Sequence, residues 1–304
     1  GLRLYCSTAC PKTQTGRTGA RVAVSRIDLH LHTTHSDGSL QPSEVLALAK
    51  KANVTALAIT DHDITSGISE AKIAAQHLGI EVIPGVEVSS YDGRSELHIL
   101  GYYVECDDSL FMSRLDSLRA SRHRRNPLII ERLREAGLDV TYDEVRALAG
   151  TESVGRPHIA QLLMRKKYVS SAKEAFDRYL AEGKPAYVAR ELPRPEEAIR
   201  WIREARGVAV LAHPTWVKDT GDGLRSCITA LKEAGLGGVE VHYSTHSKSQ
   251  TASYLELTQR LGLLVTGGSD FHGITKPDIE VGYGRGDLRV DPALLEPLQA
   301  AARA

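Results

Sequence analysis

Nine potential metal ligands are spread along the chain, and most of them directly follow a run of apolar residues. They comprise six histidines and three carboxylates, namely His30, His32, Asp37, His62, Glu87, His98, His213, Asp270 and His272. Apolar runs of this kind are typical of buried parallel strands, and α/β barrels place their chemistry at the carboxyl ends of such strands. Imidazole and carboxylate donors suit divalent metal ions, so the pattern predicts a multinuclear metal centre.

Two pairs of ligands separated by a single residue give the strongest local signals. His30 and His32 alternate with apolar residues, and side chains two apart in a strand project from the same face. Both imidazoles can therefore bind one cation, and Asp28 on that face is expected to orient a ring nitrogen. Asp270 and His272 repeat the spacing after two glycines, which would let the backbone approach a crowded site.

The remaining ligands are expected in loops at strand ends. His62 lies between Asp61 and Asp63, and we expect His62 to bind metal while the two aspartates support ligands or cap a helix. Glu87 follows a Pro-Gly pair, which we interpret as a turn at a strand end, and its carboxylate could bridge two cations. His98 and His213 gain their significance from the whole set rather than from their own surroundings.

Groups that bind a phosphate without touching metal should be cationic. The candidates are Arg156, His158 and Lys184, each flanked by glycine or proline, and His246 is a further candidate because it follows a predicted strand. The basic segment 119–125 is interpreted as the solvated face of a helix rather than as a nucleic-acid groove.

These residues require a scaffold of alternating strands and helices, which indicates parallel βαβ units in an α/β fold. The expected helices cover 43–52, 66–78, 195–205, 223–234 and 247–261, and the expected strands are Val22–Leu31, Thr55–Thr60, Glu81–Pro84, His98–Val104, Val208–Ala212, Gly238–Tyr243 and Leu263–Thr266. About seven strands favour a barrel over an open sheet.

A helical stretch over 105–190 interrupts this alternation. It contains a long arginine-rich helix over 110–136, broken or kinked near Pro127, and shorter helices over 143–148, 157–166 and 171–182. We therefore expect a barrel domain from 23–104 and 191–304 with an inserted, substrate-capping helical subdomain over 105–190. Residues 1–22 are interpreted as a disordered or artefactual extension.

Bulk composition excludes several function classes. The 38 basic and 38 acidic residues cancel, so no overall field favours duplex DNA or an anionic membrane. Aromatic residues make up 5% of the chain, which argues against a broad base-stacking surface. No apolar stretch approaches the ~20 residues that cross a bilayer, and the four cysteines are expected to be reduced thiols. A cytoplasmic protein is expected.

The motifs around the ligands resemble those of the PHP (polymerase and histidinol phosphatase) family. They are DLHLHTTHSDG, AITDHD, PGVEVS, LHILGY, LAHP and GGSDFHG, in the family's order over residues 26–104 and 207–274. GRPHIA and GKPAY in the insertion resemble the branch of 3′,5′-nucleotide bisphosphate phosphatases and 5′-to-3′ exonucleases on short RNA.

The resemblance implies a distorted (β/α)7 barrel holding two or three divalent ions, with manganese expected and iron or zinc as alternatives. One ion would bind His30, His32, Glu87 and Asp270. A second would bind Glu87, His98 and His213, and a third would bind Asp37, His62 and His272.

The implied activity is hydrolysis of a phosphate monoester on a small nucleotide such as adenosine 3′,5′-bisphosphate, through a hydroxide that bridges two metal ions. Glu87, His213 and Asp270 would be catalytic, and either His213 or a metal-bound water would protonate the leaving oxygen. The alternatives are a 5′-to-3′ exonuclease on short RNA, a histidinol-phosphatase-like enzyme, an amidohydrolase and a non-catalytic PHP module. The intact ligand set disfavours the last of these.

Overall fold

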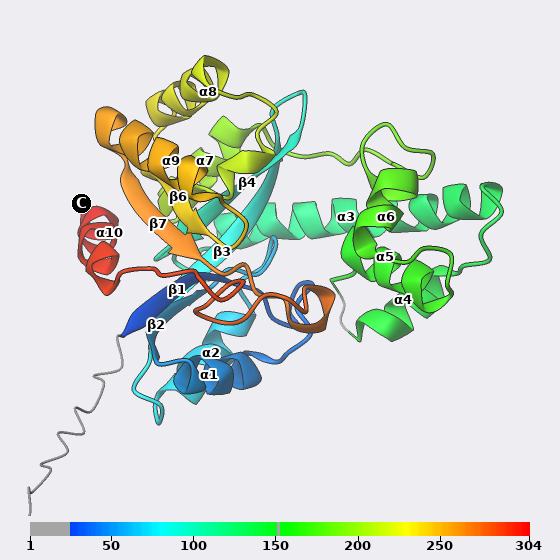
Figure 1. The fold of residues 1–304 in the computed structure, drawn as a ribbon, viewed down its shortest axis with the longest axis horizontal. Helices are drawn as coiled ribbons and strands as arrows, with labels where there is room; N and C mark the ends of the chain where they lie inside the picture. Colours follow the sequence, from blue (N-terminus) through cyan, green and yellow to red (C-terminus); the bar gives the residue numbers. More distant parts are fainter. Residues whose placement is uncertain (1–24, 151–152) are drawn as a thin grey trace, which may run out of the picture.

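A nearly closed barrel of seven strands forms the body of the protein (Figure 1). The structure is a computed structural model, and it describes residues 25–150 and 153–304. The strands hydrogen-bond in chain order, and they are β1 (Arg26–Leu31), β2 (Val54–Ile59), β3 (Glu81–Tyr91), β4 (Glu96–Tyr102), β5 (Val208–Leu211), β6 (Gly238–Tyr243) and β7 (Leu264–Gly268). The expected α/β barrel is thereby confirmed, and the expected extension over 1–22 lies outside the described residues.

The expectation that all strands are parallel is wrong at β4. This strand runs antiparallel to both β3 and β5, whereas the other neighbouring strands in the sheet are parallel. The reason is a tight turn, in which Asp92 Oδ1 accepts the backbone N–H groups of Arg94 at 2.6 Å and Ser95 at 2.7 Å. A two-strand hairpin reverses the chain without a crossover helix. The amino end of β4 therefore lies at the edge where the other strands have their carboxyl ends.

The barrel closes between β7 and β1 just beyond the regular ladder. Asp270 N–H donates to the His30 carbonyl at 2.9 Å, and His32 N–H donates to the Phe271 carbonyl at 3.0 Å. A Cβ on Gly268 would lie 2.4 Å from the His30 backbone nitrogen, so only glycine fits at this seam. This contact confirms the expected role of the glycine pair and places the ligands of β1 beside those that follow β7.

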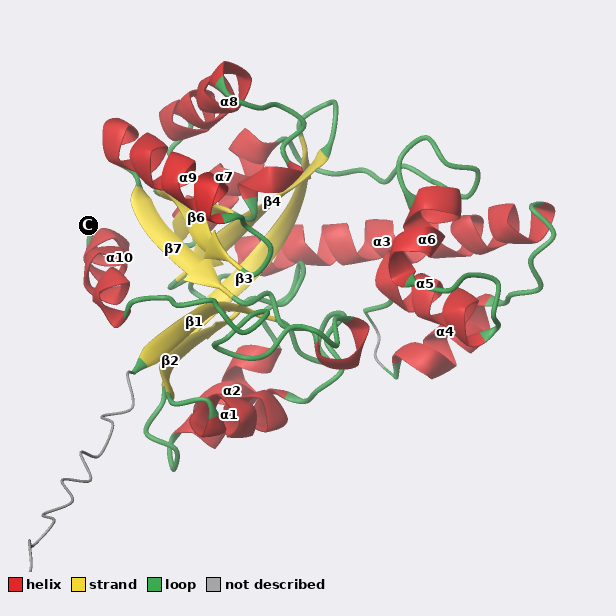
Figure 2. Ribbon diagram, in the orientation of Figure 1, coloured by secondary structure: helices red, strands yellow, loops and turns green. Residues whose placement is uncertain are grey.

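Helices cover the outside of the barrel (Figures 1 and 2). α1 and α2 pack on β1 and β2 on one side, and α7, α8 and α9 pack on β3 to β6 on the other, each layer with its own apolar cluster. Their bounds are α1 (Pro42–Lys51), α2 (Gly67–Ala75), α7 (Pro195–Glu204), α8 (Asp222–Glu233), α9 (Lys248–Leu261) and α10 (Leu295–Arg303), with short turns η2 (Pro214–Trp216), η3 (Gly273–Thr275) and η4 (Pro292–Leu294).

The helices that interrupt the alternation lie to one side of the barrel (Figure 1). They are α3 (Ser109–Glu135), α4 (Tyr142–Ala149), α5 (Arg156–Arg165), α6 (Ala172–Ala175) and the π-helical turn η1 (Phe176–Leu180), and they enclose a separate apolar cluster around Ile129, Val145 and Ile159. α3 runs through Pro127 as one helix, so of the break or kink expected there the break is wrong. α3 begins against the barrel and ends inside the helical group, and it thereby joins the two.

Within the part of the chain that the structure describes, no helix has both the length and the apolar character that crossing a membrane requires.

Candidate metal centre

Glu87 occupies the centre of the predicted ligand set, but it lies inside β3 rather than after a turn. The strand continues through Pro84 and Gly85 because β2 ends at Ile59, opposite Pro84, so the missing N–H of proline interrupts no ladder. A Cβ on Gly85 would lie 2.9 Å from the Ile59 carbonyl oxygen, which explains the glycine. Beyond this point β3 pairs with β4, and Glu87 projects into the open end of the barrel.

Five imidazoles surround the Glu87 carboxylate. The nitrogens within 3.3 Å of its two oxygens belong to His30, His32, His62, His98 and His213. Glu87 Oε2 faces the first three, and Oε1 faces the last two at 2.9 and 3.0 Å. Burial alone would raise the pKa of Glu87, but the imidazoles of His62 and His98 hold this pKa well below its ordinary range. The carboxylate is therefore ionised and faces two sets of nitrogen donors, as a bridging ligand would.

The first group of donors lies at the barrel seam. His30 Nε2 and His32 Nε2 are 3.1 Å apart, and Asp270 Oδ1 lies 3.6 and 3.3 Å from them. Asp270 has a φ of 57°, in the left-handed region, which aspartate adopts more readily than most residues other than glycine. Two imidazole nitrogens and two carboxylate oxygens, counting Glu87, thus converge on one point.

A second group forms around Asp37. Its oxygens lie 3.2 Å from His272 Nε2 and 3.8 Å from His62 Nε2. Asp61 fixes the loop that carries Asp37, because it accepts the Thr33 N–H and the Thr33 hydroxyl, both at 2.7 Å. Asp61 therefore has the expected supporting role, since it holds the loop that carries a predicted ligand.

The third group lies on β4 and after β5. His98 is at the amino end of β4, and the antiparallel direction of that strand brings it to the same edge as His213. His213 has a φ of 25°, a strained conformation, and its N–H is held by Glu240 Oε2 at 2.8 Å. The structure thus brings all nine predicted ligands together.

This donor set fits divalent cations. Within the described residues, three groups have ligand atoms that all lie within 4.8 Å of one another, and they are His30 with His32 and Glu87, His62 with Glu87 and His98, and His32 with Asp37, His62 and His272. Their side chains are almost fully buried, and buried carboxylates require compensating positive charge. Nitrogen and oxygen donors without thiolate favour manganese, iron or zinc over softer metals.

A residue that the sequence analysis missed supports two of the ligands. Glu240 on β6 is fully buried, and its Oε1 accepts from His30 Nδ1 at 2.9 Å while its Oε2 holds His213. We expected Asp28 to orient a ring nitrogen, and this is wrong. Asp28 instead accepts backbone N–H groups from Ser269 at 2.8 Å and Gly282 at 2.7 Å, which fasten β1 to the segments after β7. A charged residue inside the strand VEVHY was the available signal for Glu240.

A cavity of about 730 Å³ opens onto the metal ligands and extends to the helical insertion. The predicted phosphate ligand Arg156 lines it, together with four arginines that were not predicted, Arg122, Arg125, Arg190 and Arg285, of which Arg285 is paired with Asp278 at 2.9 Å. The interpretation of 119–125 as a solvated face is wrong at Arg122 and Arg125, because both are buried. Lys276 also lines the cavity and forms an ion pair with Asp270 Oδ2.

The other four guanidinium groups outnumber their carboxylate partners. Arg122 pairs with Asp63 at 2.7 Å, Arg156 pairs with Glu96 at 2.5 Å, and Arg190 reaches both carboxylates at 3.4 and 3.3 Å. Among the described residues these two carboxylates are the partners of the cluster within 4 Å, which leaves two positive charges uncompensated.

Arg125 is the guanidinium that lacks a carboxylate. Among the described residues it donates to Asn126 Oδ1 at 3.1 Å, and its buried Nε has no hydrogen-bond partner. Burial lowers the pKa of Arg125 to about 8, and the neighbouring guanidiniums of Arg156 and Arg190 act in the same direction. A buried cation in such surroundings is stabilised by an anion bound beside it.

Three of the predicted phosphate ligands do not line this cavity, namely His158, Lys184 and His246. His158 is buried near the start of α5, where its Nδ1 accepts the Gly155 N–H at 3.0 Å, and burial lowers its pKa, so the imidazole is neutral. His246 is held by the Val241 carbonyl at 2.8 Å. The sequence did not place these residues, because a flanking glycine or proline, or a position after a strand, indicates a turn and does not reveal where the turn faces.

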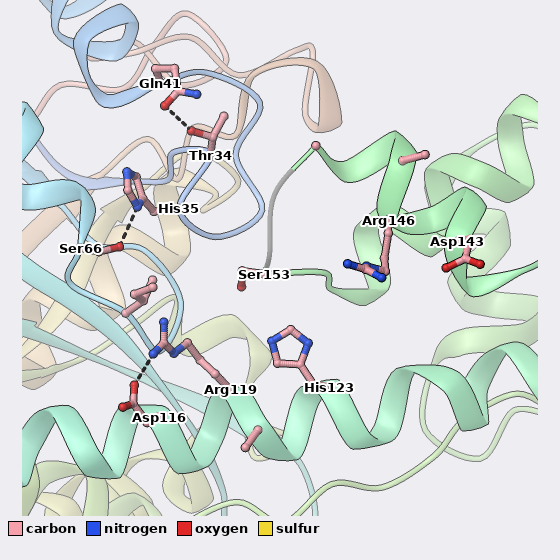
Figure 3. A pocket seen from close by; sticks show the side chains of 14 residues that line it. Thr34, His35, Gln41, Ser66, Asp116, Arg119, His123, Asp143, Arg146 and Ser153 are labelled. Atoms are coloured by element: carbon pink, nitrogen blue, oxygen red, sulfur yellow. Dashed lines mark hydrogen bonds and ion pairs between the residues drawn. The ribbon is translucent and has the colours of Figure 1, made fainter.

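A larger cavity, of about 1110 Å³, lies between the loop at Thr34 and helices α3 and α4 (Figure 3). Arg119 and Arg146 line it, but Asp116 and Asp143 do as well, and Arg119 is paired with Asp116. The charges of its described lining residues are balanced, and none of the nine ligands is among them, so we place the chemistry in the smaller cavity.

Comparison with known proteins gives a consistent result. The family model described as the PHP domain matches residues 28–194. The chain is 38% identical to a 5′-3′ exoribonuclease of Haemophilus influenzae, covering 81% of this chain and 90% of the relative. It is 34% identical to a 3′,5′-nucleoside bisphosphate phosphatase of Chromobacterium violaceum, covering 86% and 92%. A crystal structure from Bifidobacterium adolescentis, assigned as a metal-dependent phosphoesterase, superposes with a TM-score of 0.82 at 30% identity, covering 91% and 96%.

Proposed function

The chain belongs to the PHP family of metal-dependent phosphoesterases, and from this premise we propose that it removes a phosphate from a small nucleotide bearing two phosphates, such as adenosine 3′,5′-bisphosphate. One observation carries the proposal. A single cavity holds both the imidazole and carboxylate cluster around Glu87 and a cluster of arginines with two uncompensated positive charges. A phosphate monoester dianion carries about two negative charges at neutral pH, which matches that surplus.

The nine ligands would hold divalent ions. Glu87 would be shared between the group that contains His30 and the group that contains His98. Bound cations supply Lewis-acid activation of water and neutralise the charge of the phosphoryl oxygens. Glu240 accepts from His30 Nδ1 and so would keep that imidazole in one tautomer, while its other carboxylate oxygen holds the backbone N–H of His213. Manganese is the proposed ion, with iron and zinc as alternatives.

The residues of the chain would divide the substrate between two regions. The scissile phosphate lies at the ligands, where Lys276 adds an ammonium group beside Asp270. The second phosphate lies against Arg122, Arg125, Arg156 and Arg190, because planar guanidiniums bind phosphate oxygens in pairs. Glu87, His213 and Asp270 are the proposed catalytic residues, since each borders both the ligand groups and the cavity.

A second candidate is exonucleolytic cleavage of short RNA from its 5′ end. It is favoured by the relative from Haemophilus influenzae, which is named as a 5′-3′ exoribonuclease. The same ligands and arginines serve either reaction, because both require a phosphoester at the metal centre and a further phosphate nearby.

The proposal is tested by measuring phosphate release from a panel of phosphorylated compounds, including adenosine 3′,5′-bisphosphate, ribonucleotides of two to five units and an aryl phosphate. The expected result is a preference for substrates with two phosphates, and Arg156→Ala is expected to raise KM for these about tenfold more than for the aryl phosphate. Equal activity on singly and doubly phosphorylated compounds, with no effect of Arg156→Ala, would contradict the proposal.

A further inference from the structure

Exposed large apolar side chains gather at the cavity that contains the metal ligands. Among the described residues Trp216, Ile274 and Met164 are exposed to 51%, 72% and 38%, and all three line this cavity. Phe176 lines it as well. Exposed apolar groups that cluster around a polar site indicate that part of the ligand is apolar.

Trp216 is the best placed of these side chains. Its indole packs against the His213 ring, with 4.2 Å between ring centroids, and it lies 5.9 Å from the His98 ring. A short turn holds it there, because Trp216 N–H donates to the His213 carbonyl at 3.0 Å and Val217 N–H donates to the Pro214 carbonyl at 3.1 Å. The indole is therefore supported from behind by a proposed metal ligand, while half of its surface remains open.

We propose that Trp216 is a specificity-determining residue that stacks against the nucleobase of the substrate. The inference rests on the proposed function, which assigns the phosphates to the metal ligands and the arginines and leaves the base as the flat, apolar part of the substrate. A heteroaromatic base stacks on an exposed indole regardless of its hydrogen-bonding edge. One indole, rather than a broad aromatic surface, agrees with the low aromatic content of the chain.

Fluorescence provides a test that is independent of turnover. The chain has two tryptophans, and Trp201 lies on α7 beneath the Arg114 guanidinium, away from the cavity. Trp201→Phe therefore leaves Trp216 as the reporter, and Trp216→Phe leaves Trp201 as the matched control. In the metal-loaded protein, adenosine 5′-monophosphate is expected to quench the emission of Trp201→Phe saturably, whereas ribose 5-phosphate and inorganic phosphate leave it unchanged. Quenching in the Trp216→Phe control instead, or no quenching while the nucleotide inhibits phosphate release, would overturn the proposal.

Kinetics separate stacking from mere support of His213. Trp216→Leu is expected to lower kcat/KM for adenosine 3′,5′-bisphosphate roughly tenfold, mainly through KM, and to affect a base-free pentose bisphosphate far less. Trp216→Phe is expected to retain most of the activity on the nucleotide. Equal losses on both substrates would show that Trp216 acts only by holding His213. If the wild-type protein releases phosphate from neither substrate, the proposed function fails rather than this inference.

Discussion

The barrel edge and the helical insertion both bury ionisable groups, but the two regions suit ligands of opposite charge. At the barrel edge, Glu87, Asp37 and Asp270 lie among six imidazoles, and together these groups offer the nitrogen and oxygen donors that divalent cations bind. In the insertion and the strands beside it, four guanidiniums face Asp63 and Glu96 and require an anion. Each region is electrostatically incomplete alone, and a phosphorylated substrate with metal ions would complete both.

This difference shows that buried charge is informative only together with its partners. Arg122 forms a buried ion pair with Asp63, whereas Arg125 has no carboxylate partner within 4 Å among the described residues. The larger cavity in Figure 3 makes the same point, since its arginines lie beside aspartates and leave little charge for a ligand. Cavity size alone would have selected the wrong site.

The barrel side of the comparison is tested most severely by Glu87→Ala. Removal of the carboxylate shared by two ligand groups is expected to abolish most metal binding and to lower phosphate release by about a thousandfold or more. Elemental analysis and phosphate release measure the two effects on the same preparation. A variant that keeps its full metal content would show that Glu87 does not bridge, and wild-type protein with less than one ion and no activation by manganese would refute the metal centre.

The ion pair between Arg122 in the insertion and Asp63 in the barrel is tested by Arg122→Met. Asp63 would lose its shorter ion pair while remaining buried, and the expected loss of stability is about 3 kcal/mol. Burial raises the pKa of Asp63, but Arg190 and Arg122 hold it below its ordinary value of 3.8, so its contribution exists above that pH and disappears as the pH falls.

The loss in Arg122→Met should accordingly be greatest at neutral pH and should shrink in acid. Denaturant unfolding at several pH values measures it, and a loss independent of pH would point to packing instead.

Arg125→Met makes the same substitution at an arginine without a carboxylate partner, and the opposite pattern of effects is expected. Because this guanidinium is buried without a carboxylate partner, we expect unfolding stability to be unchanged or to rise by about 1 kcal/mol. Substrate binding should suffer instead, with KM for a bisphosphorylated nucleotide raised roughly tenfold and KM for an aryl phosphate little changed. Thermal unfolding and steady-state kinetics test both halves. Destabilisation equal to that of Arg122→Met would remove the distinction between the two arginines.

The smallest effect is expected in the second cavity. Arg119 forms an exposed ion pair with Asp116 within α3, and such pairs contribute little. Arg119→Gln should change stability by less than about 0.5 kcal/mol and leave KM and kcat for every substrate of the panel unchanged. A rise in KM confined to the longer oligoribonucleotides would show that this cavity takes part in binding RNA.

Much of the site followed from local patterns. His30 and His32 could be paired from the strand periodicity, and Asp270 with His272 from the same spacing after a glycine pair, because side-chain direction in a strand depends only on position. The role of the glycine pair at the seam could also be predicted, because two residues without side chains next to predicted ligands indicate a close approach of the backbone. Glu87 lies at the centre of the predicted ligand set although its surroundings were misjudged, because Pro84 and Gly85 indicate a turn in isolation and fit a strand only where β2 has ended.

The buried arginines of the site could not be predicted from such local patterns. Arg122 and Arg125 look like surface residues in a basic helix, and their burial depends on where α3 lies relative to the barrel. Glu240 and Asp28 are both carboxylates within strands, but which one meets an imidazole and which meets backbone N–H groups depends on the closure of the barrel.

The sequence by itself determined the barrel, its order of elements and the nine side chains that meet at its edge, because strand periodicity and the positions of strand ends are local properties of the chain. Only the tertiary structure decided which charges are left without partners. That outcome depends on distances between segments far apart in the chain, such as Asp63 and Arg122 or His30 and Glu240, and no local pattern encodes those distances.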